Sequence, residues 1–429
     1  MLVIERPETA GASLDYNRLK AAPLSSDWAE AAEREARIHS IHVYPAKFPA
    51  LIFQKAIELA TRRGVEVKRI GDIFCGSGTV LYETAVRNLE FWGCDINPVA
   101  TLIARVKGMR PDLEAFTAAA DRISLRFETA SRASTLSPVA VSRLTPWYRA
   151  GQFEDLVKLR NAIESETEDH SEARLLFDCA FSAIAKPTSQ WKARSTKPAR
   201  HEEKTPAPVL QSFQKQCRLM MAAWAEASSA TLPPFEVHRA DVKSVPGPAA
   251  PLDLIITSPP YAMSYEYADV HQLSALWLNY AEDHRDLRRD VIGTASRRSN
   301  LSFALRNLNP VGLQIVFRLF EKDRALAESL ASYFLDMQQV VGRCHDFLRP
   351  GGVCVFVVGN TQLKDVRIDN ANHMVECFID AGFENISVLR RPLSNKPNTP
   401  YRQANGRLSS TPTRMGIYAE EYVVMAQRR

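Results

Sequence analysis

The residues best suited to chemistry lie at 257–261, Thr-Ser-Pro-Pro-Tyr, directly after the apolar run 252–256. That run predicts a buried strand, so the motif falls at the carboxyl end of a strand, where open α/β sheets bind their ligands. Two consecutive prolines remove two N–H donors and leave carbonyls free to accept hydrogen bonds. The alternative is an ordinary strand-ending turn, since Pro-Pro marks loops widely. The predicted catalytic residues are Ser258, Pro259, Pro260 and Tyr261.

This loop suits the exocyclic amino group of a nucleic-acid base. The amino group must be held by acceptors while its nitrogen attacks an electrophile, and Ser258 offers a hydroxyl oxygen while Pro259 offers a carbonyl. Tyr261 can stack on a base that has been drawn out of a duplex. The loop therefore favours chemistry on an amino group of a flipped base.

A second motif, DIFCGSGT at 72–79, lies between a predicted strand and a predicted helix. Its glycines permit a tight turn and a close approach to a ligand, and the turn presents backbone N–H groups and a helix N-terminus. Similar turns bind dinucleotides, but this one is neither GxGxxG nor a P-loop, because no third glycine and no GK[ST] follows. The motif therefore indicates a cofactor-binding loop.

Two acidic residues at later strand ends extend the predicted cofactor site. Asp95, in GCDINP at 93–98, follows Gly76 by about 20 positions, the spacing of a carboxylate that accepts from ribose hydroxyls. The alternative is that Asp95 only caps the next helix. Asp241 ends a third predicted strand, 234–242, and can accept an adenine amino group. The predicted cofactor-binding residues of these segments are Asp72, Phe74, Gly76, Gly78, Thr79, Asp95, Asn97 and Asp241.

The elements that position these motifs alternate between strands and helices at first. Residues 65–108 have the order βαβα, which predicts an α/β fold with a parallel sheet and crossover helices. The alternation then stops for a long helical stretch before the strands resume, so one sheet is expected to be completed late in the chain. We divide the chain into 1–107, an N-terminal segment with the first, cofactor-binding half of the domain; 108–232, a mostly helical insertion; and 233–429, the catalytic half with a helical excursion at 281–340.

Basic residues gather in two regions. The chain has a net charge of +5 and a pI near 8.8, which is weak support for a nucleic-acid partner by itself. The segment 186–218, inside the insertion, and the segment 285–298 both concentrate Lys and Arg, as phosphate contacts require. The alternative is a solvated surface. The predicted nucleic-acid-binding residues are Lys186, Lys192, Arg194, Lys197, Arg200, Arg297 and Arg298.

Composition narrows the class of protein. Hydrophobic residues make up 45% and charged residues 24%, which is typical of a globular protein. No run of about 18 apolar residues predicts a transmembrane helix, and the N-terminus does not resemble a signal peptide. The seven cysteines are scattered without a CxxC pair, so they indicate reduced cysteines in a cytoplasmic protein, with no disulfide framework and no zinc or other metal site.

Together the motifs DIFCGSGT, GCDINP and TSPPY resemble the amino-group DNA methyltransferases, which have an S-adenosylmethionine (SAM) loop and a [DNS]PP[YFW] catalytic loop. The resemblance implies a Rossmann-like sheet of seven strands, SAM as cofactor and double-stranded DNA as substrate. SPPY is similar to the cytosine-N4 version, whereas adenine-N6 enzymes more often begin with Asp or Asn. HVYPAKFP at 42–49 resembles the segment that closes over the methionine end of SAM, which adds Tyr44, Lys47 and Phe48 to the cofactor-binding residues.

The resemblance covers 41–105 and 235–280 strongly and 340–429 loosely, with 348–360 similar to the strand that lines the target-base pocket. The long insertion lies between the ribose-binding and adenine-binding strands, which departs from the usual arrangements. We expect the insertion, with its basic loop at 186–218, to read the DNA, helped by 281–300.

The expected reaction is a direct displacement without a metal or a covalent enzyme intermediate, so no cysteine nucleophile is expected. Other interpretations remain open: an adenine-N6 enzyme, an RNA guanine-N2 methyltransferase, a DNA-binding regulator that has lost catalysis, and an NAD-dependent oxidoreductase, for which SPPY has no use. A cognate restriction endonuclease is a possible partner. The oligomeric state and the recognition sequence do not follow from these motifs.

Overall fold

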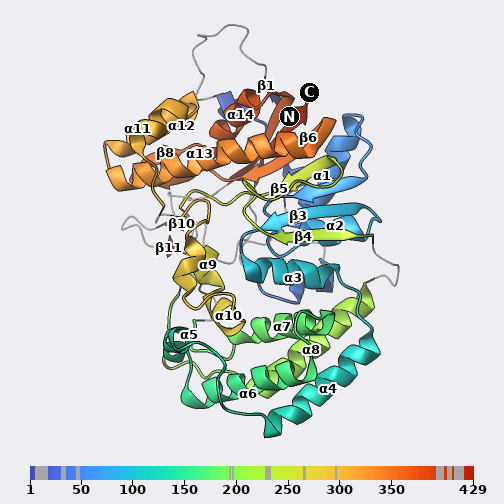
Figure 1. Ribbon diagram of the computed structural model, residues 1–429. Helices are drawn as coiled ribbons and strands as arrows, with labels where there is room; N and C mark the ends of the chain where they lie inside the picture. Colours follow the sequence, from blue (N-terminus) through green and yellow to red (C-terminus); the bar gives the residue numbers. More distant parts are fainter. Residues whose placement is uncertain are drawn as a thin grey trace.

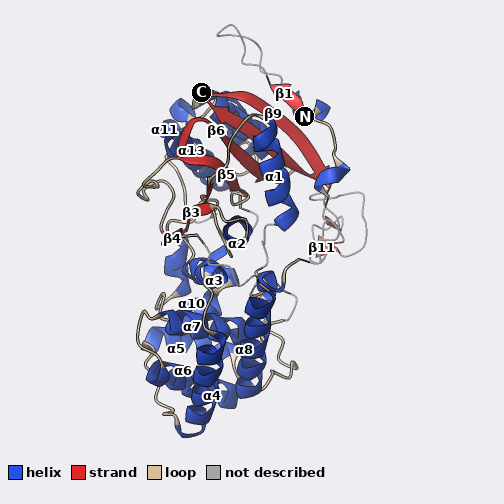
Figure 2. Ribbon diagram, turned by 90° about the vertical axis from the view of Figure 1, so that its right-hand side faces the viewer, coloured by secondary structure: helices blue, strands red, loops and turns tan. Residues whose placement is uncertain are grey.

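The computed structural model has two parts, a sheet covered by helices and a bundle of helices packed at one end of it (Figure 1). A view turned by 90° shows the same division (Figure 2). The structure describes residues 1–4, 18–29, 35–44, 49–192, 195, 198–227, 233–263, 267–294, 297–392, 401–402, 408–409 and 420–429, with the backbone alone at 267, 401–402, 408–409 and 420.

The sheet has eight strands in the order β1-β9-β12-β6-β5-β2-β3-β4. The five neighbouring strands β6, β5, β2, β3 and β4 are parallel to one another. Strand β12 is antiparallel to both β6 and β9, and β1 is antiparallel to β9. The strands are β1 (Leu2–Ile4), β2 (Arg69–Asp72), β3 (Glu90–Asp95), β4 (Phe235–Arg239), β5 (Leu252–Thr257), β6 (Leu348–Val358), β9 (Phe383–Pro392) and β12 (Glu420–Arg428).

The predicted α/β fold with a mostly parallel, Rossmann-like sheet is confirmed, with one strand more than the seven expected. The additional strand, β1, is a three-residue edge strand in a segment without a clear sequence pattern. The central strand β5 is buried at all six positions, as its mostly apolar sequence predicts for a parallel strand covered on both faces, and its one charged residue, Asp253, pairs with Arg349.

Helices cover both faces of the sheet. One face packs on α12, α13 and α14, with Phe334, Phe356 and Phe378 in its core. The other face packs on α1 and α2, with Phe53 and Leu254 in its core. The helices are α1 (Ala50–Arg62), α2 (Thr79–Ala85), α3 (Pro98–Gly108), α12 (Pro310–Phe320), α13 (Arg324–Phe347) and α14 (Asn370–Asp380).

The segment predicted as an insertion forms helices that share a hydrophobic core with α3. Phe116 stacks on Phe177 with 4.9 Å between ring centroids, and Trp224 meets Phe116 edge-on at 5.2 Å. The same core includes Ile103 of α3, so the bundle is packed on the sheet's own helix layer and not tethered loosely. The helices of this module are α4 (Leu113–Thr129), α5 (Pro138–Leu144), η4 (Thr145–Trp147), α6 (Ala150–Glu166), α7 (Glu172–Ala185) and α8 (Val209–Glu226).

The remaining elements are short. They are η1 (Arg18–Ala21), η2 (Ser26–Trp28), η3 (Arg37–Ser40), α9 (Tyr267–Val270), α10 (Gln272–Trp277), η5 (His284–Arg288), α11 (Leu301–Asn307) and the strand pairs β7 (Thr361–Leu363) with β8 (Val366–Ile368) and β10 (Tyr401–Arg402) with β11 (Leu408–Ser409). All seven cysteines are buried and free. Within the described part of the chain, no helix has the length and apolar character needed to cross a membrane.

Candidate active site

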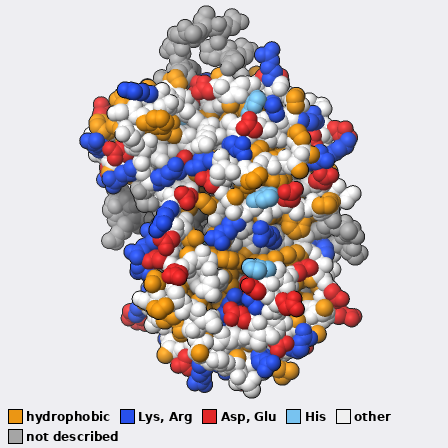
Figure 3. All heavy atoms as spheres, viewed as in Figure 1, with side chains coloured by type: hydrophobic (Ala, Val, Ile, Leu, Met, Phe, Trp, Pro, Cys, Tyr) orange, Lys and Arg blue, Asp and Glu red, His pale blue; other side chains and the backbone are white. Residues whose placement is uncertain are grey.

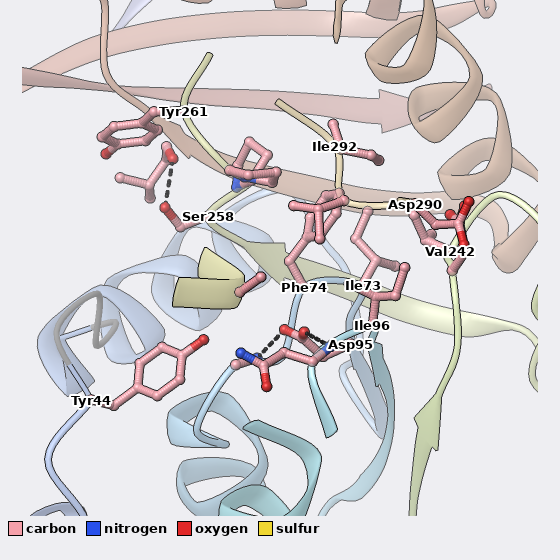
Figure 4. A pocket seen from close by; sticks show the side chains of 18 of the residues that line it. Tyr44, Ile73, Phe74, Asp95, Ile96, Val242, Ser258, Tyr261, Asp290 and Ile292 are labelled. Carbon is pink, nitrogen blue, oxygen red and sulfur yellow. Dashed lines mark hydrogen bonds between the residues drawn. The ribbon is translucent and has the colours of Figure 1, made fainter. Parts of the chain in front are cut away.

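A cavity lies at the edge of the sheet where the parallel strands end. Loops that follow β2, β3, β4 and β5 line it, as the strand-end motifs predict. Because β12 is antiparallel, its first residues lie at this same edge, beside the ends of β6 and β9. Figure 4 shows Ser258 and Tyr261 at one end of the cavity, Val242 and Asp290 at the other, and Asp95 between them.

The glycine turn after β2 has the left-handed backbone that its residues suit, with φ of +47° at Gly76 and +76° at Gly78. Gly76 lines the cavity. Gly78 does not, and it serves packing instead, because a Cβ there would lie 2.7 Å from Cα of Ala104 in α3. The turn therefore offers one glycine to the cavity and uses the other to approach a helix.

Asp95 is the acidic group at the centre of the cavity. Its Oδ2 accepts from the Gly76 N–H at 2.9 Å and its Oδ1 from the Asn97 N–H at 2.8 Å. Burial raises the pKa of Asp95 to about 6. Helix α3 is capped by Asn97, whose Oδ1 accepts from the Val99 N–H at 3.0 Å. Asp95 is therefore not the residue that caps this helix.

Three other predicted cofactor residues support the turn without lining the cavity. Asp72 is buried, and its Oδ1 accepts from the Thr257 hydroxyl at 2.7 Å and the Phe74 N–H at 3.2 Å, which ties the cofactor loop to the end of β5. Burial raises the pKa of Asp72 to about 7. Thr79 is buried, and its Oγ1 has no hydrogen-bond partner among the described residues. Gly78 is the third. Phe74, a further predicted cofactor residue in the same turn, does line the cavity.

The end of the cavity away from Ser258 is mostly apolar. Ile73, Ile96 and Val242 line it together with Ile292 (Figure 4). Such a slot suits a flat heterocycle, and Asp241 also lines it, at the end of the predicted third strand. The lining therefore combines an apolar slot that would suit an adenine ring with the carboxylate of Asp95 in the same cavity, as the adenosine part of SAM would require.

The segment predicted to close over the cofactor is described in part. Tyr44 lines the cavity, and its ring stacks on that of His271 with 5.1 Å between centroids and 20° between planes. His42 Nε2 lies 2.8 Å from the Ser182 hydroxyl of α7, which links this segment to the helical module. Lys47 and Phe48 lie outside the described residues.

The catalytic loop after β5 is held by three contacts with distant segments. The Ser258 hydroxyl donates to the Val357 carbonyl at 3.1 Å, and the Tyr333 hydroxyl donates to the Pro260 carbonyl at 3.1 Å. The Tyr261 hydroxyl donates to Oε1 of Glu421 at 2.6 Å. All four predicted catalytic residues, Ser258, Pro259, Pro260 and Tyr261, line the cavity.

Sequence reasoning missed several cavity residues. Arg391 and Glu421 lie near the ends of strands that contain other charged and polar residues, so no contrast in the local sequence marks them. Asp290 is an exposed residue just after η5, where no local pattern points to a site. Their place at the cavity depends on the strand order and not on neighbouring residues.

The predicted basic residues occupy different environments. Lys186 is half-buried, and its Nζ donates to the Ser195 carbonyl at 2.7 Å, so it holds its own loop together. Lys192 and Arg298 are exposed. Arg200 pairs with Glu202 at 2.6 Å on the surface, and Arg297 pairs with Asp336 at 2.5 Å. Arg194 and Lys197 lie outside the described residues.

On the face shown in Figure 3, Lys and Arg side chains border the hollowed middle of the molecule, between the sheet and the helical module. The exposed Arg289, in the second basic segment, belongs to the loop that follows η5, next to the cavity residue Asp290. The residues described in the structure include no group of three or more His, Cys, Asp and Glu side chains placed to hold a metal ion.

Comparison with known proteins supports the same class. The chain is 23% identical over 388 residues to the Type II methyltransferase M.MvaI of Kocuria varians, covering 83% of this chain and 84% of that protein. No protein family model matches. Among solved structures, a SAM-dependent methyltransferase of Methanosarcina mazei covers 90% of this chain and 98% of its own at 10% identity and a TM-score of 0.29. An rRNA methyltransferase of Streptomyces viridochromogenes covers 90% of this chain and 88% of its own at 11% identity and a TM-score of 0.27.

The strand order and the motifs have the arrangement expected of a SAM-dependent methyltransferase fold, and the chain is similar to a Type II methyltransferase along most of both sequences. The resemblance to the amino-group DNA methyltransferases, drawn from three short motifs, is confirmed by a relative that matches along most of both chains.

Proposed function

We propose that the protein methylates the exocyclic amino group of a base flipped out of double-stranded DNA, with cytosine N4 as the favoured atom. The observation that carries the proposal is the Ser258 hydroxyl in the cavity. It donates its hydrogen to the Val357 carbonyl, so its oxygen can accept a hydrogen bond from another donor. An amino group supplies such a donor. Serine at this position is also the version of the loop that resembles cytosine-N4 enzymes.

The residues of the chain divide the work between the two ends of the cavity. Asp95 would accept from the ribose hydroxyls of SAM, Asp241 and the apolar slot would hold its adenine ring, and Tyr44 would contact its methionine group. When bound, SAM supplies an electrophilic methyl group carried on a sulfonium. Ser258 and the Pro259 carbonyl accept the two amino hydrogens, so the nitrogen lone pair points to the methyl carbon, and Tyr261 stacks on the base.

Direct displacement needs no group on the enzyme to form a bond. The amino nitrogen forms the new bond to carbon as the carbon–sulfur bond breaks, and the nitrogen then loses one proton to solvent. Cys75, in the cofactor loop, is buried, and burial raises the pKa of its thiol well above the usual value. Such a thiol is a poor nucleophile, which agrees with a mechanism without a covalent intermediate.

The helical module and the loop after η5 are the proposed DNA-reading surfaces. The exposed Lys192 and Arg200 lie on the module, and the exposed Arg289 and Arg298 lie in the segment that follows the catalytic loop. Phosphate contacts of this kind position a duplex without selecting its sequence.

The test is to incubate the purified protein with SAM and unmethylated genomic DNA, digest the DNA to nucleosides and identify the product by mass spectrometry. N4-methylcytosine is expected. N6-methyladenine would keep the reaction but overturn the role of Ser258 in choosing the base. Methyl transfer to RNA alone, measured in parallel with total RNA, would overturn the DNA substrate. The Ser258→Ala variant, assayed on the same DNA, controls for a contaminating methyltransferase.

A further inference from the structure

A buried ion pair lies at the target end of the cavity, and the reaction proposed above does not use it. Arg391, near the end of β9, and Glu421, near the start of β12, are direct cross-strand partners. Nη1 of Arg391 donates to Oε2 of Glu421 at 2.8 Å. The two residues are only 1% and 4% exposed, although burying a charged pair is costly for a fold. The pair therefore calls for an explanation beyond stability.

Each member of the pair has a second contact. Nε of Arg391 donates to the Trp28 carbonyl at 2.9 Å, which anchors the guanidinium to the N-terminal segment. Oε1 of Glu421 accepts from the Tyr261 hydroxyl at 2.6 Å. The contacts thus run from the N-terminal segment through two strands and end on the aromatic residue of the SPPY loop.

The ring of Tyr261 is confined from another side as well. A Cβ on Gly359 would lie 2.9 Å from Cε2 and 3.1 Å from Cζ of Tyr261, so the ring lies directly on the backbone after β6. A hydrogen bond to a carboxylate is stronger than one between neutral groups. Together the close contact with Gly359 and the bond to the carboxylate restrict the movement of the ring.

We infer that Glu421 and Arg391 are positioning residues for methyl transfer, which hold the Tyr261 ring in place against the target base. The inference rests on the proposed function and extends it to two residues outside the recognised motifs. The base must present its amino nitrogen in line with the methyl carbon, and a fixed stacking surface limits how far the base can tilt. If the pair served the fold alone, turnover would not depend on the Tyr261 hydroxyl.

The test begins with Tyr261→Phe, which keeps the stacking ring and removes the hydroxyl that reaches Glu421. We expect kcat on DNA to fall about 10-fold, with KM for DNA changed less than about threefold and Kd for SAM unchanged. The matched control is Tyr148→Phe, which removes a buried hydroxyl that donates to the Ala185 carbonyl at 2.8 Å inside the helical module. This control should keep the wild-type kcat.

Glu421→Gln, alone and combined with Tyr261→Phe, separates positioning from folding. Thermal unfolding first establishes a temperature at which every variant is folded. If Glu421 acts through Tyr261, the double variant loses no more activity than Tyr261→Phe alone, because Tyr261→Phe has already removed the hydrogen bond between the two residues.

The outcomes are distinct. If wild-type protein transfers no methyl group to DNA, the proposed function fails and the inference fails with it. If the wild type is active and Tyr261→Phe retains kcat within about twofold, the inference alone is overturned. If the two single losses multiply in the double variant, Glu421 acts by another route and its assigned role is wrong.

Discussion

At the cofactor end of the cavity the contacts are local, whereas at the target end they join distant parts of the chain. Asp95 reaches the glycine turn across 19 residues of sequence. Ser258 reaches Val357 across 99 residues, and Tyr261 reaches Glu421 across 160. The contacts between Asp95 and the glycine turn need only one βαβ unit to form. The second depends on the whole sheet, including its antiparallel strand.

This difference separates the functions of the two ends. A change at the cofactor end should alter SAM affinity and leave the chemical step nearly intact. A change at the target end should alter turnover and leave SAM affinity intact. The link between the ends is Asp72, whose carboxylate joins the cofactor loop to Thr257 at the end of β5.

The largest effect is expected from Ser258→Ala, which removes the hydroxyl proposed to accept from the amino group. We expect kcat to fall about 100-fold or more, because the contact aligns the reacting nitrogen in the transition state. Kd for SAM, measured by calorimetry, should stay within about twofold of wild type. Ser124→Ala, which removes a hydroxyl bonded to the carbonyl four residues earlier in α4, is the control. Equal turnover in Ser258→Ala and wild type would contradict the role.

Asp95→Ala should weaken SAM binding and leave kcat nearly unchanged, the opposite of Ser258→Ala. Loss of the carboxylate removes the proposed ribose acceptor and leaves two backbone N–H groups without their partner. The lost contact with ribose costs about 1–3 kcal/mol of binding free energy, so Kd for SAM should rise about 10- to 100-fold, while kcat at saturating SAM stays within a few-fold. Asp112→Ala, at the exposed cap of α4, is the matched control for removing a capping carboxylate. An unchanged Kd would refute ribose binding by Asp95.

Binding of SAM should also depend on pH through the same carboxylate. Burial raises the pKa of Asp95 to about 6, and only its ionised form accepts from hydroxyls on both oxygens. SAM affinity should therefore fall as the pH is lowered from 7 to 5, by up to about 10-fold at pH 5. Binding near pH 6 should release protons, because ribose contacts favour the carboxylate.

The stability of the folded protein without SAM depends on pH in the opposite direction to SAM affinity. An acid whose pKa is raised in the folded state makes the unliganded protein less stable as the pH rises from about 4 to about 6. Calorimetry of SAM binding in two buffers of different ionisation enthalpy measures the protons released. Asp72, with its pKa raised to about 7, does not line the cavity. A pH step that survives in Asp95→Ala would therefore assign the titration to a group other than Asp95.

The same contrast explains how much of the molecule the sequence predicted. Gly76, Asp95 and Ser258 were predicted because each lies at the end of a strand or in the turn that follows it, where local spacing and residue type suffice. Arg391 and Glu421 were not, because their place depends on β12 being inserted antiparallel between β6 and β9. No local pattern encodes that pairing, which only the completed sheet fixes.

The helical module illustrates the same limit. Its helices were predicted from their apolar periodicity, but their docking on α3 was not, since that contact comes from one shared core. Lys186 was grouped with DNA-binding residues by charge alone, whereas in the structure its Nζ donates within its own loop. Charge in sequence does not distinguish a phosphate contact from a loop contact.

The smallest effect is expected from Lys192→Ala, which tests whether DNA affinity is separate from both ends of the cavity. Lys192 is exposed beside a loop that Lys186 holds in place. If Lys192 contacts a phosphate, KM for DNA should rise about threefold at 0.1 M salt, and the slope of log affinity against log salt should fall by about one. Kd for SAM and kcat should not change.

Lys186→Ala is the informative comparison, because it removes the bond from Nζ to the Ser195 carbonyl and so disturbs the loop itself. It should raise KM for DNA as well, but with thermal unfolding at a lower temperature, which Lys192→Ala should not show. Filter binding across a salt series with each variant separates the two cases. An unchanged salt slope in Lys192→Ala would remove this loop from the DNA contact and shift that role to the arginines after the catalytic loop.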